Sequence, residues 1–550
     1  MDIDRRSLFR AGAATLVVAA CRSQDEAPIV PAPPPVSPLS EPLADGVGLT
    51  GLPHPELAEL SIAELAGKLA QHELTSVALV QRYRERVAAL DGNLHSILEL
   101  NREAEQIAER LDRERAAGTL RGPLHGIPIL VKDNIDTGDT MLTTAGSLAL
   151  ASTAPARRDA FVIAKLRAAG AILLGKTNLS EWANFRGTSS VSGWSGRGGQ
   201  CRNPYALDRS PSGSSSGSGV ATAAGLCAVS IGSETDGSIV SPASCNSLVG
   251  VKPTIGLVSR SGVIPISPSQ DTLGPMARSV ADAALVLTAI AGFDPEDPIT
   301  VIARPEDYTK YLDPKALAGA RIGVPRKGWF GIVRHVDTIM ASALDKLREL
   351  GAELVDNVEL EIPPTLDGAE LTVFLAEIKS AMEAYLARRG DPKVRSLFDV
   401  MMFDLQNRER ELRSFGHEWF ERAQVMNGME SPGYREARAS CLAIARDQLL
   451  DGAMQKHRLD ALVVGTGGLP PLIDPIAGDA WPAGPPASTL PAVAGYPHVT
   501  VPAGSYHGLP VGLSFIGGPF SEGKLLGYAF AFEQATRHRK PPRYFATAPL

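Results

Sequence analysis

Apolar positions recur with helical spacing from about residue 60 onward. Ser61 and Glu64 have the spacing of a capping box, and Leu65 and Leu69 follow on one face of the same segment. The pattern then continues at Val77, Val80, Tyr83, Val87 and Leu90. These positions predict two consecutive helices at the start of the folded part of the chain.

Short runs of consecutive apolar residues follow the helices. Residues 126–131 (GIPILV) predict a buried strand that ends at Lys132. A helix, a glycine and a strand then occur in that order twice, over residues 161–174 with Gly170 and over residues 339–355 with Gly351. Glycine adopts the left-handed conformation that ends many helices. The alternation of helices and short apolar strands predicts a layered α/β fold.

The pattern changes between about residues 360 and 455. Charged helical segments such as 408–413 and 434–449 replace the strand patterns there, which predicts a helical insertion or cap on the α/β body. Strand patterns return at 461–464 and, as a hairpin-like pair, at 499–501 and 511–516.

The N-terminus has the pattern of an export signal. Arg5 and Arg6 precede a short apolar run over residues 11–20, which stops at Cys21. The adjacent arginines resemble a twin-arginine signal, and the sequence before Cys21 resembles a lipoprotein cleavage site, although a plain cleaved signal would have the same apolar run. We therefore expect a signal peptide over 1–21, a lipid on Cys21 and a location in the bacterial cell envelope, on the periplasmic side.

A proline-rich linker is predicted over residues 22–50. Seven prolines lie between Pro28 and Pro42, and such a segment stays extended. The rest of the chain, over residues 51–545, is expected to form the folded domain.

Composition narrows the classes of partner and cofactor. The 550 residues carry a net charge of −7, so a nucleic acid partner is not expected. After Cys21 the cysteines are Cys201, Cys227, Cys245 and Cys441, which form neither a C-x-x-C pair nor a zinc motif. They are either partly disulfide-bonded or simply small buried side chains. We expect no metal and no cofactor.

The candidate chemistry lies in two serine-containing segments. Residues 213–219 read GSSSGSG and run into an alanine-rich helix predicted over 220–228, so the serines are placed at a helix N-terminus, where negative charge is stabilised. Residues 231–239 read IGSETDGSI. A flexible linker would not continue into a helix, and helix capping explains only one serine.

These segments resemble the two halves of the amidase signature. GIPILVKDN at 126–134 resembles that family's lysine motif. Further matching motifs follow in the family's order at 175–182 (GKTNLSEW), 203–205 (NPY), 251–254 (VKPT), 494–497 (AGYP) and 501–504 (VPAG). The resemblance spans roughly residues 57–540. It implies an amidase-signature fold, in which a mixed β-sheet core is covered by helices on both faces.

The resemblance also implies a mechanism and its residues. Ser238 corresponds to the nucleophile, Ser214 to the bridging serine after a cis peptide bond, and Lys132 to the base. A lysine at the end of an apolar strand can be desolvated, which lowers its pKa. Backbone N–H groups of Thr235, Asp236, Gly237 and Ser238 correspond to the oxyanion hole. The activity expected from this set is hydrolysis of carboxylic amides through an acyl-enzyme.

Two departures from the family pattern bear on the substrate. Asp236 stands where many members have a second glycine, and Ile239 and Val240 follow the nucleophile where many have an arginine. Without that guanidinium, a small acidic substrate loses one anchor. The residues at 234–238 and 182–186 are most similar to the peptide amidase branch, which removes the C-terminal amide of peptides. Fatty, aryl or other small amides remain alternative substrates.

Three other motifs compete with this interpretation. GAILLGKT at 170–177 satisfies the P-loop expression, but its four intervening residues are predicted to be a strand. GSSSG at 213–217 satisfies the nucleophile elbow with Ser215 as nucleophile, but a turn-like segment precedes it instead of a strand. SEGK at 521–524 has the spacing of S-x-x-K, yet Ser521 opens an apolar helix and is expected to be its N-cap.

Two other roles for the whole chain fit the sequence less well. An envelope binding lipoprotein of the same fold would have lost the chemistry, but all three relay residues are present. A glutamine amidase that works with partner chains and tRNA in the cytoplasm does not fit the export signal or the acidic charge. The helical insertion is expected to help shape the acyl pocket, without named contact residues.

Overall fold

The computed structural model describes residues 51–482 and 484–549. The predicted signal peptide, Cys21 and the linker over residues 22–50 lie outside the described residues. Within the described ranges, no helix combines the length and the apolar character needed to cross a bilayer.

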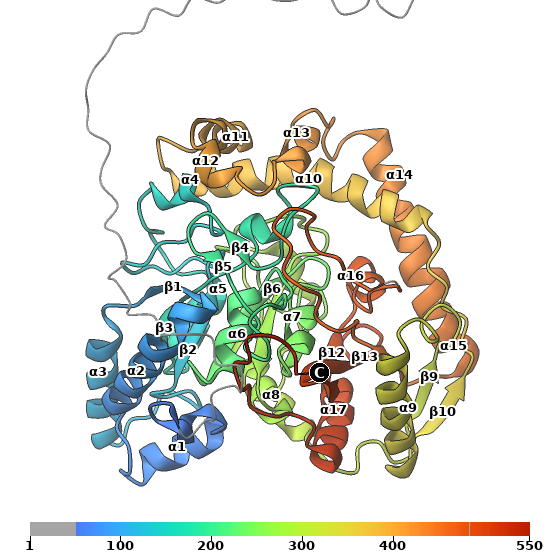
Figure 1. Cartoon of the computed structure of the whole chain (residues 1–550), viewed down its shortest axis with the longest axis horizontal. Helices are drawn as coiled ribbons and strands as arrows, with labels where there is room; N and C mark the ends of the chain where they lie inside the picture. The colour runs from blue at the N-terminus through green and yellow to red at the C-terminus, as the bar shows by residue number, and fades with distance from the viewer. Residues whose placement is uncertain (1–50, 483, 550) are drawn as a thin grey trace, which may run out of the picture. The chain divides into compact units, whose positions relative to one another are not determined.

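A single large sheet forms the centre of the described chain (Figure 1). Its order is β1-β3-β2-β6-β8-β7-β12-β13-β11-β9-β10, and a separate small ribbon pairs β4 with β5. The strands are β1 Ile97–Leu100, β2 Pro128–Lys132, β3 Ile172–Thr177, β4 Trp194–Ser195, β5 Gly199–Gln200, β6 Val229–Glu234, β7 Val249–Lys252, β8 Thr272–Ala277, β9 Arg321–Val324, β10 Glu353–Asp356, β11 Ala461–Gly465, β12 His498–Tyr506 and β13 Leu509–Ile516.

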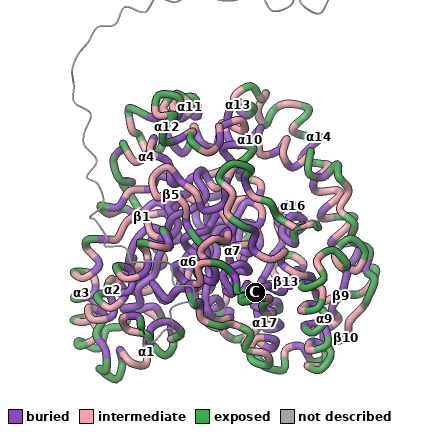
Figure 2. Tube along the Cα trace, in the orientation of Figure 1, coloured by how far each residue is buried: buried purple, intermediate pink, exposed green. Residues whose placement is uncertain are grey.

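The sheet is mixed, as predicted. β3, β2 and β6 are mutually parallel, as are β10, β9 and β11, whereas β12 is antiparallel to both β7 and β13. Every residue of β2, β3 and β6 is buried, which explains why residues 126–131 read as an unbroken apolar run instead of an alternating one. Figure 2 shows these interior strands as the buried centre of the fold.

Helices cover both faces of this sheet, so the predicted amidase-signature architecture is confirmed. α6 and α7 pack together, α8 and α17 pack together, and both pairs contact the central strands. The helices of this body are α1 Ile62–Ala70, α2 Ser76–Leu94, α3 Ala104–Ala116, α4 Leu148–Ala151, α5 Phe161–Ala168, α6 Ser216–Ala223, α7 Val240–Cys245, α8 Val280–Ile290, α9 Arg334–Glu349, α16 Thr489–Ala494 and α17 Glu522–Thr536, with 3-10 turns η2 Pro55–Ala58, η3 Glu181–Asn184, η4 Pro298–Ile302 and η5 Tyr308–Tyr311.

Several local predictions are confirmed by the geometry. Ser61 and Glu64 form both hydrogen bonds of the capping box at the start of α1. Gly170 and Gly351 have positive φ after α5 and α9, as the helix–glycine–strand pattern requires. β12 and β13 form the predicted hairpin, and His507 and Gly508 at its tip both have positive φ, which is typical of a type I′ turn.

The alanine-rich helix after the serine cluster differs from its predicted range. α6 begins at Ser216 and ends at Ala223, whereas the sequence pattern placed the helix at 220–228. It ends early because Gly225 has a φ of 65° and packs against Ala58, where a Cβ would lie 2.6 Å from a backbone atom. The serines therefore form the first turn of the helix and its approach.

Residues between β10 and β11 are helical, which matches the predicted secondary structure of the insertion. The segments are α10 Thr365–Arg389, α11 Leu397–Gln406, α12 Arg408–Glu411, α13 Glu418–Gln424, α14 Pro432–Cys441, the π-helical η6 Leu442–Asp451 and α15 Gly452–His457. α10, α11 and α13 share a buried apolar cluster with Trp182 and Phe185. The helical segment is thus packed onto the loop that follows β3.

Candidate active site

The site lies at one edge of the sheet, where three parallel strands end. Lys132 is the last residue of β2, Thr177 the last of β3 and Glu234 the last of β6. β2 lies between the other two, with Lys132 opposite Thr177 and Val131 opposite Ile231. Because parallel strands carry their carboxyl ends to the same edge, three sequence-distant motifs converge there.

Lys132 is completely buried and is held by serines. Its Nζ lies 2.7 Å from Ser214 Oγ, 2.9 Å from Ser233 Oγ and 3.1 Å from the Ser233 carbonyl oxygen. No salt bridge found among the described residues includes Lys132. Burial lowers the pKa of Lys132 from 10.5 to about 7, against the opposing influence of the Glu234 and Asp271 carboxylates. At neutral pH a large fraction of this amine is uncharged.

Ser214 approaches Lys132 from the segment just before α6. The peptide bond between Gly213 and Ser214 is cis, as the family resemblance implied. The Ser214 carbonyl accepts a hydrogen bond from the Ser180 N–H at 3.1 Å, and the next residue, Ser215, donates its N–H to the Ser238 carbonyl at 3.2 Å. The hydrogen bonds of the described residues join Ser214 to Lys132 but include none between the hydroxyls of Ser214 and Ser238.

The loop that carries Ser238 is closed by Glu234. One oxygen of this buried carboxylate accepts the N–H groups of Ile239 at 2.7 Å and Val240 at 3.1 Å. Burial raises the pKa of Glu234, while Lys252 lowers it. Gly237 has a φ of 78°, which favours glycine, and a Cβ there would lie 2.9 Å from Ser488 Oγ.

Asp236, the departure from the family's second glycine, fits without backbone strain. It is not among the described residues with positive φ, so its position does not require glycine. Its carboxylate accepts a hydrogen bond from the Thr489 hydroxyl at 2.8 Å, which ties the loop to α16. Burial raises the pKa of Asp236. The side chain therefore anchors the loop.

The backbone N–H groups predicted to form the oxyanion hole lie in this loop. The main-chain hydrogen bonds of the described residues include none donated by Thr235, Asp236, Gly237 or Ser238. These four residues belong to no helix or strand. No main-chain hydrogen bond found within the described chain therefore occupies these four N–H groups.

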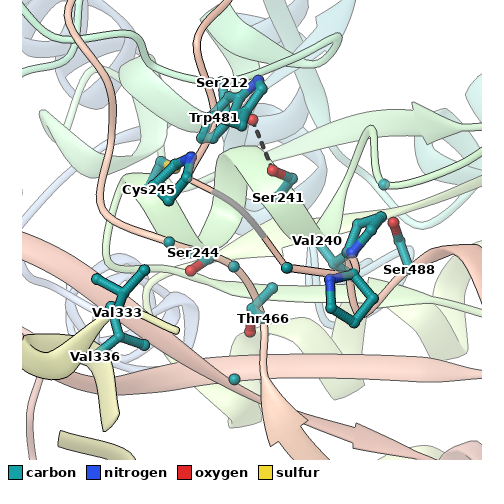
Figure 3. Close-up of a pocket in the computed structure, with 18 of the residues that line it drawn as sticks. Ser212, Val240, Ser241, Ser244, Cys245, Val333, Val336, Thr466, Trp481 and Ser488 are labelled. Atoms are coloured by element: carbon teal, nitrogen blue, oxygen red, sulfur yellow. Dashed lines mark hydrogen bonds between the residues drawn. The ribbon is translucent and has the colours of Figure 1, made fainter. Parts of the chain in front are cut away.

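A cavity of about 350 Å³ opens beside this loop (Figure 3). Gly213 and Gly237, the neighbours of Ser214 and Ser238, line it, as do Ser212 and Ser241, whose hydroxyls lie 2.8 Å apart. The apolar side chains that line it include Trp329, Ile332, Val333, Val336, Met340 and Trp481. The described residues that line it include Asp236 and Asp337 but no lysine, arginine or histidine.

A second cavity of about 240 Å³ reaches the same loop through other residues. Asn134, Ser233 and Thr235 line it, together with Ala381 and Tyr385 of α10. Trp182, Ala183 and Asn184 have left-handed dihedral angles, and this bend places Ala183 in the wall of the second cavity and Asn184 in the wall of the first. The helical insertion thus contributes α10 to the surroundings of the site, as the sequence predicted for that segment in general terms.

Comparison with known proteins shows the family of this chain. The sequence profile of the Amidase family matches residues 78–526. The chain belongs to the amidase family. It is 41% identical to a probable amidase of Arabidopsis thaliana over 500 residues, which is 89% of this chain and 92% of that protein. It is also 36% identical to a glutamyl-tRNA(Gln) amidotransferase chain of Moorella thermoacetica over 88% of this chain and 99% of that protein.

Solved structures give the same result. The native peptide amidase from Stenotrophomonas maltophilia is 48% identical, with a TM-score of 0.85, over 88% of this chain and 99% of that one. A peptide amidase in complex with the competitive inhibitor chymostatin is 49% identical, with a TM-score of 0.86 and the same coverage. The resemblance to the peptide amidase branch is confirmed, and this protein is an amidase.

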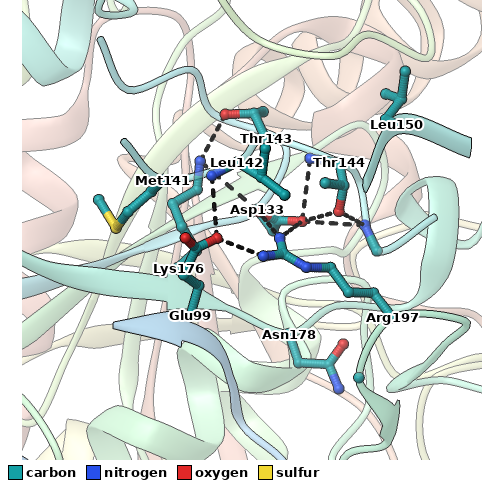
Figure 4. A network of polar contacts seen from close by, with 12 residues as sticks. Glu99, Asp133, Met141, Leu142, Thr143, Thr144, Leu150, Lys176, Asn178 and Arg197 are labelled. Atoms are coloured by element: carbon teal, nitrogen blue, oxygen red, sulfur yellow. Dashed lines mark hydrogen bonds and ion pairs between the residues drawn. The ribbon is translucent and has the colours of Figure 1, made fainter. Parts of the chain in front are cut away.

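A polar network holds the strand end that carries the amidase's Lys132 (Figure 4). Asp133 is buried and accepts hydrogen bonds from Thr144, from the Gly146 N–H and from Arg197, which also pairs with Glu99. Lys176 lies in the same network, with its Nζ 2.8 Å from Thr143 Oγ1 and 3.9 Å from Asp133. Lys176 is buried within β3 and Asp133 is buried directly after β2, so the network holds the ends of these two strands together.

The competing motifs have structural roles in the amidase. Lys176 lies within strand β3 instead of a phosphate-binding loop. Ser215 hydrogen-bonds the main chain of Ser233 through its hydroxyl. Ser521 is the N-cap residue of α17, as predicted, but its hydroxyl donates to the Gly518 carbonyl and makes no capping bond. The sequence left open whether the cysteines after Cys21 form a disulfide. All four are free and buried: Cys201, Cys227, Cys245 and Cys441.

The motifs contained further site residues that the sequence did not single out. Ser233 contacts the Lys132 amine twice, and Asn134 donates to Ser233 Oγ at 2.9 Å. Glu234 closes the Ser238 loop. All three residues lie inside the motifs that match the family, but their hydrogen-bond partners are known only from the three-dimensional structure. Among the described residues, no group of three or more His, Cys, Asp or Glu side chains is arranged to hold a metal ion.

We expect Lys176→Met to lower the free energy of unfolding by about 2–4 kcal/mol, because it removes a buried cation and leaves Asp133 and two oxygen acceptors with fewer partners. Urea unfolding measures this change. The control is Lys327→Met, at an exposed salt bridge, which should change stability by less than about 1 kcal/mol. A P-loop role would instead leave stability unchanged and make the melting temperature depend on ATP and Mg²⁺.

Proposed function

We propose that this amidase removes the C-terminal amide of peptides through an acyl-enzyme on Ser238, with Ser214 and Lys132 as its proton relay. The observation that carries the relay is the 2.7 Å contact between the buried Lys132 amine, whose pKa is lowered to about 7, and the Ser214 hydroxyl. The similarity to peptide amidases supports the substrate class.

The hydrogen-bond partners of Lys132 support its role as a neutral base. An uncharged amine has two N–H donors and one lone pair. The Ser233 carbonyl can only accept, and Ser233 Oγ accepts from Asn134, so two acceptors take the two N–H groups of the amine. The remaining lone pair then faces the Ser214 hydroxyl. In this arrangement Lys132 takes the Ser214 proton while Ser214 takes the proton of Ser238.

The chemical steps follow from that transfer. Ser238 Oγ forms a bond to the amide carbon, and the charge on the carbonyl oxygen is met by the N–H groups of the loop from Thr235 to Ser238. The proton stored on Lys132 returns through Ser214 to the amide nitrogen, the C–N bond breaks and ammonia leaves. Water then attacks the ester, the free acid departs and Ser238 recovers its proton.

The cavity beside the loop supports a neutral or cationic acyl group. Its described lining carries Asp236 and Asp337 and no cationic side chain, so a substrate carboxylate would find no partner there. This agrees with the absence of arginine after the nucleophile. The apolar side chains that line it suit the side chains and backbone of a peptide. Amides of fatty or aryl acids are the alternative substrates.

We further propose that the amidase is exported to the bacterial envelope and held there by a lipid on Cys21. The arginine pair, the apolar run and the cysteine that follows it support this proposal. Such a location would also separate the protein from the glutamyl-tRNA(Gln) amidotransferases among its relatives.

Replacement of the relay residues tests the mechanism. We expect Ser238→Ala and Lys132→Ala each to lower kcat by at least about 10⁴-fold, and Ser214→Ala by at least about 100-fold, since each removes a group of the relay. The measurement is ammonia release from C-terminally amidated peptides, fatty amides, aryl amides and malonamate-like acids.

Ser216→Ala serves as the matched control, because Ser216 belongs to the same serine cluster and bonds only the Ser212 carbonyl and, weakly, Ser180. It should stay within about tenfold of wild type. Full activity in Ser238→Ala would refute the mechanism. Activity confined to fatty or aryl amides would refute the peptide substrate and leave the mechanism intact.

The pH dependence tests the neutral lysine. Because the pKa of Lys132 is about 7 and only the uncharged amine accepts a proton, kcat/KM should be constant above this pH and fall about tenfold per pH unit below it. Glu234→Gln removes a carboxylate that raises the pKa of Lys132, so the fall of kcat/KM on the acidic side of the profile should move to lower pH. Asp345→Asn, on the surface of α9, should leave this fall in place. A profile that stays flat from pH 8 to pH 5 would contradict the assignment.

Charge selection tests the cavity. Among acylated amino acid amides that differ only in the side chain, kcat/KM should fall in the order lysine, glutamine, glutamate, by about three- to tenfold per step, because one charge pair in a partly solvated cavity is worth on the order of 1 kcal/mol. Asp337→Asn should narrow the differences, as should high salt. Asp345→Asn removes the same charge from the same helix outside the cavity and should not. A preference for glutamate would contradict the proposed selectivity.

A further inference from the structure

α11 has one face fixed against the body of the protein. Leu397 and Val400 are completely buried in the apolar cluster shared with α10 and α13. Asp404 is also completely buried, and its Oδ2 lies 3.2 Å from His417 Nδ1. These three positions lie on one side of the helix, so they determine which side chains point outward.

The outward side carries an apolar stripe. Phe398, Met402 and Leu405 are 52%, 37% and 50% exposed. At about 100° per residue these three positions fall within an arc of about 60° on the helix. α11 lies at the margin of the described structure, where Figure 1 and Figure 2 show no described helix or strand outside it. A surface helix normally places polar residues on such a face, so the stripe is suited to an apolar contact outside the chain.

Cationic side chains stand at both ends of this helix. The exposed cations of the segment are Lys393, Arg395, Arg408, Arg410 and Arg413. No salt bridge found among the described residues includes any of them. Most carboxylates near these cations already have other partners. Glu411 pairs with the buried Arg186, and Asp391 and Asp399 accept main-chain N–H groups. Glu409 is exposed.

We propose that this surface, formed by the apolar stripe and the five cations and called the α11 patch, docks on an anionic lipid surface. Apolar side chains on one helix face with flanking cations are typical of interfacial helices, which place the apolar face at the headgroup–acyl boundary and the cations near anionic headgroups. The chain as a whole carries a net charge of −7, so this attraction is local to the α11 patch.

A membrane is favoured over another occupant by the predicted lipid at Cys21. Residues 22–50 separate that cysteine from the described chain, and a segment of this length spans at most about 100 Å. A protein tethered within this distance of a bilayer meets it continually, so even a weak surface contact such as the α11 patch would form repeatedly. The proposal concerns a surface outside the candidate site; it rests on the proposed lipid anchor and is independent of the substrate.

Vesicle binding tests the α11 patch. The chain with Cys21→Ser carries no lipid but keeps residues 1–21, so the contribution of the patch is the difference in vesicle sedimentation between this parent and its patch variants. We expect binding to vesicles of phosphatidylglycerol and phosphatidylcholine, weaker binding to phosphatidylcholine alone, and loss of binding at high salt. Phe398→Ser/Leu405→Ser and, separately, Arg408→Glu/Arg410→Glu should each weaken binding at least about tenfold.

Matched controls carry the same changes elsewhere on the surface. Val301→Ser/Ile476→Ser replaces two exposed apolar side chains, and Arg110→Glu/Lys315→Glu reverses two exposed cations. Both should bind within about twofold of the parent, and all variants should keep their thermal unfolding and their amide hydrolysis in solution.

Three outcomes would overturn the proposal. One is that the Cys21→Ser chain binds neither kind of vesicle. Another is that the patch variants bind as strongly as their controls. The third is that sedimentation shows a dimer which Phe398→Ser/Leu405→Ser converts to a monomer, because a second copy of the chain would then be the occupant of the α11 patch.

Discussion

The removal of the Lys132 amine from water is the constraint on which the site depends. A lysine without a salt bridge is expensive to bury as a cation, and this cost is what lowers its pKa toward neutrality. A paired carboxylate would have restored the charge and raised the pKa. The fold instead supplies the oxygens of Ser214 and Ser233, which can hydrogen-bond the amine without adding a negative charge beside it. The rest of the site is arranged around that neutral group.

Burial of Lys132 requires a rigid strand end, and the surrounding charges provide it. Lys176 and Arg197 hold Asp133, the residue after Lys132, while Glu234 closes the neighbouring loop on the next strand. These charges are paired or hydrogen-bonded, whereas Lys132 has no ionic partner. The paired charges hold the strand ends in place, whereas the Lys132 amine has no ionic partner and its pKa is therefore lowered. This division allows a reactive group to persist inside an otherwise satisfied interior.

The body and the helical insertion divide the remaining tasks. The sheet edge supplies the chemistry, while α9, α10 and the segment before α16 line the cavities on either side of the Ser238 loop. α11 belongs to the same insertion but faces away from the site, with its inner side held by Leu397, Val400 and Asp404. Substitutions in these helices could therefore alter which substrate is bound, or which surface is contacted, without altering the residues at the sheet edge.

The sequence by itself determined several of the strands, the capping box and the glycine-terminated helices, and it grouped Lys132, Ser214 and Ser238 as a predicted relay. These inferences depend on local spacing and on motifs within short segments. The helical character of residues 360–455 was equally local. The end of α6 was not, since it depends on Gly225 packing against Ala58. Only the tertiary structure showed that Ser233 and Asn134 hold the lysine, that the cysteines after Cys21 are free, and that no cation stands among the described residues lining the first cavity. Those features arise where parallel strands bring distant segments to one edge, and contacts between segments far apart in the chain leave no periodic trace in the sequence.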